Sequence, residues 1–214
     1  GFDMTCQVTI PTEFERLSPY DIGETAGIEP NKISGEWVEK CNMMQKIITI
    51  AEHSKRGIVD TVYSAQNKQT GETNHEYKCQ TPVEIVHYPA KIHEPKEIEL
   101  DLEYDFNFLT VAQWSPRKDI ENTIRWFVEE FRDREVGLVV KTNVAKNCHY
   151  DRTFTQRKLS ELLKSSFYSD RKCKVYLLHG HMTEEEMTGL YKHEKIRAYV
   201  TTTHGEGFGL PIFE

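Results

Sequence analysis

This sequence of 214 residues is short of several features that would place a protein in a special class. Its few cysteines are scattered and form no C-x-x-C pair, so the sequence predicts neither a zinc site nor a disulfide framework. We expect reduced thiols, as in a cytoplasmic protein, at Cys6, Cys41, Cys79, Cys148 and Cys173. The histidines are equally scattered. His179 and His181 flank Gly180 with no acidic partner at metal-ligand spacing, so no metal site is predicted.

Positively charged residues are fewer than negatively charged ones. The sequence has 27 Lys and Arg residues and 34 Asp and Glu residues, which gives a net charge of −7. No basic field would therefore attract nucleic acid. No apolar run approaches the length that crosses a membrane, and no signal peptide is recognisable. We therefore expect a cytoplasmic protein with no nucleic-acid partner and no transmembrane segment. A longer form of the protein could still touch a membrane surface peripherally.

What is present is the composition of a globular protein, with 38% hydrophobic and 29% charged residues. The length suffices for one large or two small domains with a sizeable core. The chain opens beside an expected strand and stops at Glu214, one turn into an expected helix. We interpret it as a fragment of a longer enzyme, incomplete at both ends and inactive by itself.

Residues 1–87 follow an α/β pattern and are predicted to form a first, partial domain. The expected elements are strands at 6–10, 46–51 and 83–87, a loop or strand-to-turn segment at 21–29, helices after the cap Ser34 and at 52–59, and a loop or hairpin at 67–80. Residues 88–105 are charged and show little periodicity, so they are predicted to be an interdomain linker.

Residues 106–214 show a cleaner alternation of strands and helices, which predicts half of a doubly wound sheet. The expected elements are strands at 108–112, 136–141, 175–178 and 198–203, helices at 116–132 and 151–166, and a helix that begins with a capping box at 183–186. Ligands of such sheets bind at the carboxyl ends of the strands. Residues 113–118 and 141–143 lie there, as does the glycine loop near the end of the chain.

The last stretch, 203–214, carries the most chemistry. The alternating glycines of 205–209 let the backbone adopt positive φ and approach a ligand, and Pro211 is favoured at the start of a helix. The free N–H groups of that helix start would form an anion site for a phosphate. Glu206 and Glu214 are suited to accept hydrogen bonds from hydroxyls. Phosphate donors beside hydroxyl acceptors indicate a nucleotide-sugar ligand.

The spacing of these glutamates, with Gly-Phe-Gly-Leu-Pro between them, resembles the E-x7-E signature of the retaining glycosyltransferases of family 4. Those enzymes have the GT-B fold, so the resemblance implies two Rossmann-like, doubly wound parts, both incomplete here. In the family the first glutamate contacts the donor sugar and the second holds the ribose. The resemblance implies these roles for Glu206 and Glu214. Residues 1–87 are more weakly similar to the acceptor-side domain of the family.

A second stretch, 111–118, also leaves a strand and enters a helix. It resembles the first motif of the family's nucleotide domain, Gly-Arg-Leu and then Lys-Gly, in which the arginine and lysine neutralise the donor diphosphate. Gln113 stands where the arginine is usual and Ala112 replaces the glycine, whereas Lys118 matches the lysine. Arg117 could restore the missing charge. Cations are disfavoured at a helix N-terminus, and an anionic ligand would explain them.

The predicted donor-binding residues come from both motifs and from one further strand end. They are Gln113, Ser115, Arg117, Lys118, Lys141, Gly207, Phe208, Gly209, Leu210 and Glu214, with Glu206 as the predicted catalytic residue. Cations and backbone N–H groups could stabilise the charge of a leaving nucleoside diphosphate. No metal and no separate cofactor is therefore expected.

With these features, the resemblance implies a hexosyltransferase-type, metal-independent retaining glycosyltransferase. It would move a sugar from a nucleotide-sugar donor to a glycan or another hydroxyl acceptor, in glycan biosynthesis. Two alternatives stay open. One is a non-catalytic nucleotide-binding or scaffold module, which Gln113 and the truncation support. The other is another GT-B enzyme, such as a nucleotide-sugar epimerase.

Overall fold

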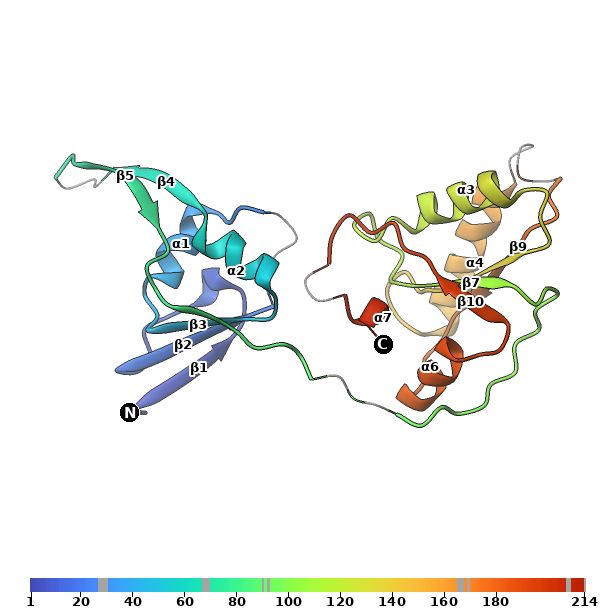
Figure 1. The fold of residues 1–214 in the computed structure, drawn as a ribbon, viewed down its shortest axis with the longest axis horizontal. Helices are drawn as coiled ribbons and strands as arrows, with labels where there is room; N and C mark the ends of the chain where they lie inside the picture. Colours follow the sequence, from blue (N-terminus) through green and yellow to red (C-terminus); the bar gives the residue numbers. More distant parts are fainter. Residues whose placement is uncertain are drawn as a thin grey trace. The chain divides into compact units, whose positions relative to one another are not determined.

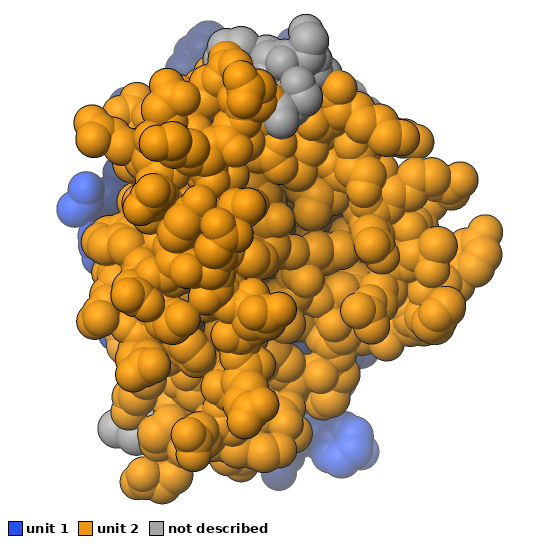
Figure 2. Space-filling model, turned by 90° about the vertical axis from the view of Figure 1, so that its right-hand side faces the viewer, with its two compact units in different colours: residues 1–89, 205–209 blue, residues 90–204, 210–214 orange. Residues whose placement is uncertain are grey.

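The structure is a computed structural model that describes residues 1–26, 31–66, 70–89, 91, 93–164, 168, 170–206 and 209–213. The chain folds into two compact units (Figures 1 and 2). Unit 1 comprises residues 1–89 and 205–209, and unit 2 comprises residues 90–204 and 210–214. No helix of the described ranges is long and apolar enough to cross a membrane.

Unit 1 is built on a parallel sheet of four strands in the order β1-β2-β3-β6. These strands are Met4–Val8, Tyr20–Thr25, Lys46–Thr49 and Val83–Ile85. The other elements are the short 3-10 helix Pro11–Glu13, helices α1 (Gly35–Cys41) and α2 (Glu52–Val59), and the antiparallel hairpin of β4 (Val62–Gln66) and β5 (Thr73–Lys78). The predicted cap of α1 is confirmed, since Ser34 accepts a hydrogen bond from the backbone N–H of Trp37 at 3.2 Å.

The core of unit 1 lies between this sheet and its helices. Ile47 of β3 and Val38 of α1 are fully buried in one apolar cluster with Phe14, and Ile58 of α2 closes it. Residues 21–29 were expected to be a loop or a strand that leads into a turn. Residues 20–25 form the strand β2, and residues 27–29 lie outside the described residues. Residues 67–69 of the expected loop or hairpin lie outside the described residues, but β4 and β5 on either side pair as a hairpin.

Unit 2 contains a second parallel sheet of four strands, in the order β10-β7-β8-β9. The strands are β7 (Asn107–Val111), β8 (Gly137–Lys141), β9 (Lys174–Leu178) and β10 (Ile196–Tyr199). The helices are α3 (Ile120–Phe131), α4 (His149–Leu163), α6 (Glu184–Tyr191) and the single turn α7 (Leu210–Phe213). The capping box predicted at 183–186 is present, with Thr183 and Glu186 bonding reciprocally to each other's backbone N–H groups.

Helices cover both faces of the second sheet. Leu138 and Val140 of β8 pack into a cluster with α3 and α4, whereas the intervening Val139 packs on the other face with Leu190 of α6. This alternation places successive side chains of one strand on opposite faces of the sheet, and both faces are buried. The predicted α/β class with parallel sheets is therefore confirmed, and unit 2 is doubly wound.

The helix predicted at 116–132 begins later than expected, at Ile120. Asp119 adopts the left-handed conformation (φ 52°, ψ 36°), which a continuous right-handed helix excludes. The four residues before Ile120 instead form a turn, in which the Ser115 carbonyl accepts hydrogen bonds from the N–H groups of Lys118 and Asp119. The apolar periodicity of the helix itself was predicted correctly, and Ile120, Ile124, Phe127 and Val128 are buried.

Part of the expected linker, 88–105, packs against unit 2. The Lys96 N–H donates to the Glu185 carbonyl at 2.9 Å, and Leu102 is buried in the cluster that contains Leu190. Gly189 of α6 permits this close approach, because a Cβ there would lie 2.0 Å from the Lys96 carbonyl oxygen. Residues 93–105 thus run as an extended stretch along α6 and the sheet of unit 2 (Figure 1).

Candidate functional site

The strand order of unit 2 reverses between β7 and β10. From β7 the chain winds outward through β8 to β9, and then returns to add β10 on the other side of β7. All four strands are parallel, so their carboxyl ends share one edge. In open α/β sheets, the loops at such a reversal diverge and leave a crevice where ligands bind. The loops that leave β7 and β10 at this point contain both predicted motifs.

The loop after β7 is anchored by Trp114, which is only 5% exposed. The Trp114 N–H donates to the Asn143 carbonyl at 2.8 Å, and its indole packs among the side chains of α3 and α4. The backbone then makes a tight turn, in which the Ser115 carbonyl accepts hydrogen bonds from the N–H groups of Lys118 and Asp119. As a result Arg117 is exposed and Lys118 is half-buried, directly before the first turn of α3.

The two loops at the reversal are joined by hydrogen bonds. The backbone carbonyl of Arg117 accepts from the His204 N–H at 3.0 Å and from the Thr203 hydroxyl at 3.2 Å. The carbonyl of Asp119 accepts from the Thr202 hydroxyl at 3.2 Å, and this hydroxyl also lies 2.6 Å from that of Thr123. The segment after β10 is therefore held against the loop that carries Arg117 and Lys118.

The side chains of Gln113 and Lys141 each form a hydrogen bond to a neighbouring loop at the same edge of the sheet. The side-chain amide of Gln113 donates to the Val144 carbonyl at 2.8 Å and so links the loop after β7 to the loop after β8. The Lys141 ammonium donates to the carbonyl of Gly180, in the loop after β9. Lys141 is half-buried, and this burial lowers the pKa of its ammonium group. Both predicted site residues thus hold loops together at the carboxyl edge.

Asp151 organises the loop after β8, and the sequence reasoning missed it. Its carboxylate, 6% exposed, accepts from the N–H groups of Val144 (3.0 Å), Ala145 (2.6 Å) and Lys146 (2.5 Å) and from the Thr155 hydroxyl (2.8 Å). The Nε2 atom of His179 lies 3.2 Å away. Burial acts to raise the pKa of this carboxyl, but the backbone hydrogen bonds outweigh it and hold the pKa well below its usual range. The available signal was an acidic residue at the start of a predicted helix, behind a loop with N–H groups to satisfy.

The C-terminal motif is described only in part. Gly209 is buried with a φ of 77°, which confirms the positive φ expected of this glycine loop, and α7 begins at the exposed Leu210. Glu206 is half-buried. The predicted site residues Gly207, Phe208 and Glu214 lie outside the described residues.

The structure brings one subset of the predicted residues together at the edge of unit 2. This subset is Gln113, Ser115, Arg117, Lys118 and Lys141. Glu206 and Gly209 belong to unit 1, whereas Leu210 belongs to unit 2. In the described part of the chain, no group of three His, Cys, Asp or Glu side chains could hold a metal ion.

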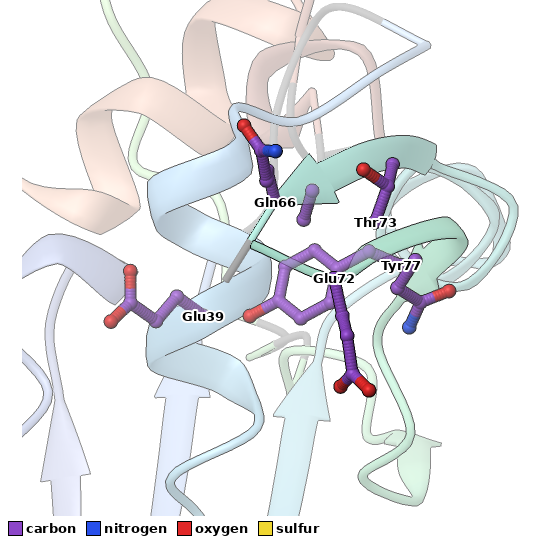
Figure 3. Close-up of a pocket in the computed structure, with 7 residues that line it drawn as sticks. Glu39, Gln66, Glu72, Thr73 and Tyr77 are labelled. Atoms are coloured by element: carbon purple, nitrogen blue, oxygen red, sulfur yellow. The ribbon is translucent and has the colours of Figure 1, made fainter. Parts of the chain in front are cut away.

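A hollow of about 930 Å³ in unit 1 contains none of the predicted residues. It lies between α1 and the hairpin, and its lining is polar: Glu39, Ala65, Gln66, Glu72, Thr73, Asn74 and Tyr77. Figure 3 shows the carboxylates of Glu39 and Glu72 directed away from each other, with the Gln66 and Thr73 side chains on the opposite side of the hairpin from Glu72. These groups do not converge on one centre, so we place the candidate site at the edge of unit 2.

No protein-family model and no curated protein matches this chain. Among solved structures, an apo structure of OtsA is similar, with a TM-score of 0.48 and 10% sequence identity. The match covers 87% of this chain and 47% of the OtsA chain. This chain therefore spans about half the length of the solved chain that it matches.

Proposed function

We propose that this chain is part of a GT-B glycosyltransferase that transfers a sugar from a nucleotide-sugar donor to a hydroxyl acceptor, with retention of configuration and without a metal. One observation carries the proposal. The two motifs that predict donor binding leave β7 and β10, the strands between which the order of the sheet reverses, and hydrogen bonds tie their loops together. Nucleotides bind at this position in doubly wound sheets.

In this proposal Lys118 and Arg117 lie on the diphosphate side of the site. As the bond between sugar and diphosphate breaks, negative charge develops on the leaving phosphate, and these cations would stabilise it. Gln113 bonds to the Val144 carbonyl, so we assign it to loop positioning in addition to any contact with the donor. Lys141 has the same positioning role through the Gly180 carbonyl.

The glutamates carry the sugar chemistry in this proposal. Glu214 would accept hydrogen bonds from the ribose diol, and Glu206 from the hydroxyls of the transferred sugar. Glu206 is then a catalytic residue in the sense that its contacts tighten as the sugar approaches the transition state. The acceptor attacks on the side of the leaving group, and the configuration is retained.

The first experiment is a thermal-shift panel of nucleoside diphosphates and their sugars, with the matching nucleosides as controls. We expect a rise in melting temperature with at least one diphosphate and a smaller rise, or none, with its nucleoside, because bound ligand stabilises the folded state. Absence of any shift across the panel at millimolar ligand would contradict the proposal.

A second experiment separates an enzyme from a binding module. It compares wild type with Glu206→Gln in a longer protein that extends past Glu214. We expect near-normal nucleoside diphosphate affinity for the variant and a lower rate of sugar transfer. Tight binding with no transfer of any sugar by the longer wild-type protein would favour the non-catalytic alternative. Inversion at C2 or C4 of the donor sugar would favour an epimerase.

A further inference from the structure

Two cysteines of unit 1 that are far apart in sequence lie side by side in its core. Cys41 is the last residue of α1, and Cys79 directly follows β5. Both belong to the apolar cluster of unit 1, where Cys41 is fully buried and Cys79 is 7% exposed. The proposed sugar transfer uses neither thiol, so their pairing calls for a separate account.

The backbone around Cys79 is tied to the end of α1 on both sides. The Asn42 amide donates to the Lys78 carbonyl at 3.0 Å, and the oxygen of the same amide accepts from the Gln80 N–H at 2.7 Å. The Thr81 hydroxyl donates to the Cys41 carbonyl at 2.9 Å. These bonds hold residues 78–81 against residues 41–42. Separation of the two cysteines would therefore break several hydrogen bonds.

The two neighbouring thiols differ in acidity. The interaction with Cys79, together with burial, raises the pKa of the Cys41 thiol. The interaction with Cys41 lowers the pKa of the Cys79 thiol, against the effect of burial. Both thiols are buried, but Cys79 is 7% exposed whereas Cys41 is fully enclosed. Because the thiolate is the nucleophile in thiol–disulfide exchange, Cys79 is the thiol that would react first.

We propose that Cys41 and Cys79 are a redox-sensitive dithiol that closes to an intramolecular disulfide by exchange with a small disulfide such as oxidised glutathione. The Cys79 thiolate attacks one sulfur of the small disulfide, which breaks its S–S bond and releases one thiolate. Cys41 then loses its proton and attacks Cys79 of the mixed disulfide, releasing the second small thiol. The protein gives up two electrons and two protons, and one small disulfide becomes two thiols.

Closure would covalently join α1 to the base of the hairpin. The bond encloses residues 42–78, which include β3, α2, β4 and β5. A cross-link over a loop of this length restricts the unfolded chain, so the oxidised protein should melt higher than the reduced protein. A rise on the order of 5 °C or more is expected from loop-closure entropy in a unit of this size. The remaining cysteines serve as internal controls: Cys6 and Cys148 are exposed, and Cys173 is buried in unit 2.

The test is a mass-spectrometric map of the thiols after equilibration with oxidised glutathione. The reduced protein is incubated with this disulfide and divided into two portions. The first portion is denatured, alkylated with N-ethylmaleimide and run on a non-reducing gel, and the monomer band is digested with trypsin; we expect a linked pair of peptides, 41–46 and 79–91, at high yield. The second portion is kept native, and we expect it to melt at a higher temperature than the reduced protein and to return to the reduced value with dithiothreitol.

Variants sharpen the test. Cys79→Ser should abolish both the linked peptides and the redox-dependent shift, whereas Cys173→Ala should keep both. If Cys79→Ser fails to fold, the peptide map of the wild-type protein decides alone. The proposal is overturned if Cys41 and Cys79 are both alkylated after oxidation, or if the mixed disulfide at Cys79 accumulates without closure.

Discussion

Single residues shape the candidate site through their backbone groups as much as through their side chains. Asp119 is the clearest case, since it is the only non-glycine residue with positive φ in the described part of the chain. Its left-handed conformation stops the turn that begins at Ser115 and lets α3 start at Ile120. Its carbonyl accepts a hydrogen bond from the hydroxyl of Thr202, in the segment after β10.

This conformation can be tested by two substitutions at one position. Glycine adopts positive φ without cost, whereas a Cβ in the left-handed region costs roughly 1–2 kcal/mol unless a polar side chain compensates. We expect Asp119→Gly to unfold near the wild-type denaturant midpoint and Asp119→Ala to be less stable than Asp119→Gly by about 1 kcal/mol. Denaturant titration of both variants measures this difference. Equal stability of the two would show that the backbone is not held in this conformation.

Asp151 leads to a prediction about pH. The folded pKa of its carboxyl lies below the unfolded value, so the charged form adds stability above the unfolded pKa of about 3.9, and this stability is lost as the pH falls toward the folded pKa. An asparagine at this position would place an NH₂ donor among N–H donors. We therefore expect Asp151→Asn to lower the free energy of unfolding by roughly 2 kcal/mol at pH 7. The deficit should shrink at pH 3. Urea titrations at both pH values check this, and a deficit that is equal at both would refute the assignment.

At the scale of elements, apolar periodicity predicted most helices and strands, because each buries one face or both faces in a core. The helix at 52–59 and the capping box at 183–186 were placed correctly. The start of α3 was placed too early, because Ser115-Pro116 has the sequence of a helix start and the φ of Asp119 cannot be read from its residue type. The packing of residues 93–105 on α6 was not predicted, because the sequence of an extended stretch without apolar periodicity does not show whether the stretch packs against a domain.

The packing of this stretch on α6 gives a prediction for Gly189. Ala is favoured over Gly inside a helix by about 1 kcal/mol, but here its Cβ would lie 2.0 Å from the Lys96 carbonyl oxygen. A backbone oxygen cannot rotate away, so the clash should exceed the gain. We expect Gly189→Ala to unfold at lower denaturant and to be cleaved faster by trypsin after Lys96. Thr188→Ala, one residue earlier in the same helix, is the control and should retain wild-type protection. An unchanged cleavage rate for Gly189→Ala would disprove this close packing.

At the scale of the whole molecule, the sequence predicted that the loops of the candidate site share one edge of a sheet, but not the hydrogen bonds that join them. The alternation of strands and helices places the residues after β7, β8 and β10 at one edge of a parallel sheet. The hydrogen bonds from Thr203 and His204 to Arg117 could not be predicted, because they join positions 86 and 87 residues apart through ordinary side-chain and backbone groups. Asp151 was missed although it stands at the start of a predicted helix, because residue types do not show which backbone N–H groups of the preceding loop its carboxylate accepts from.

The central claim is that the edge of unit 2 at the reversal between β7 and β10 binds a nucleoside diphosphate. Calorimetric titration of wild type, Lys118→Ala and Lys164→Ala tests it most directly. Lys164 is the matched control, because it is exposed at the end of α4, and a helix that returns between parallel strands ends at the opposite edge of the sheet. Loss of a charged hydrogen bond costs roughly 1.5–3 kcal/mol, so Lys118→Ala should bind the diphosphate about tenfold or more weakly. Lys164→Ala should bind as wild type does. An equal effect of both substitutions, or no binding by wild type, would contradict the account.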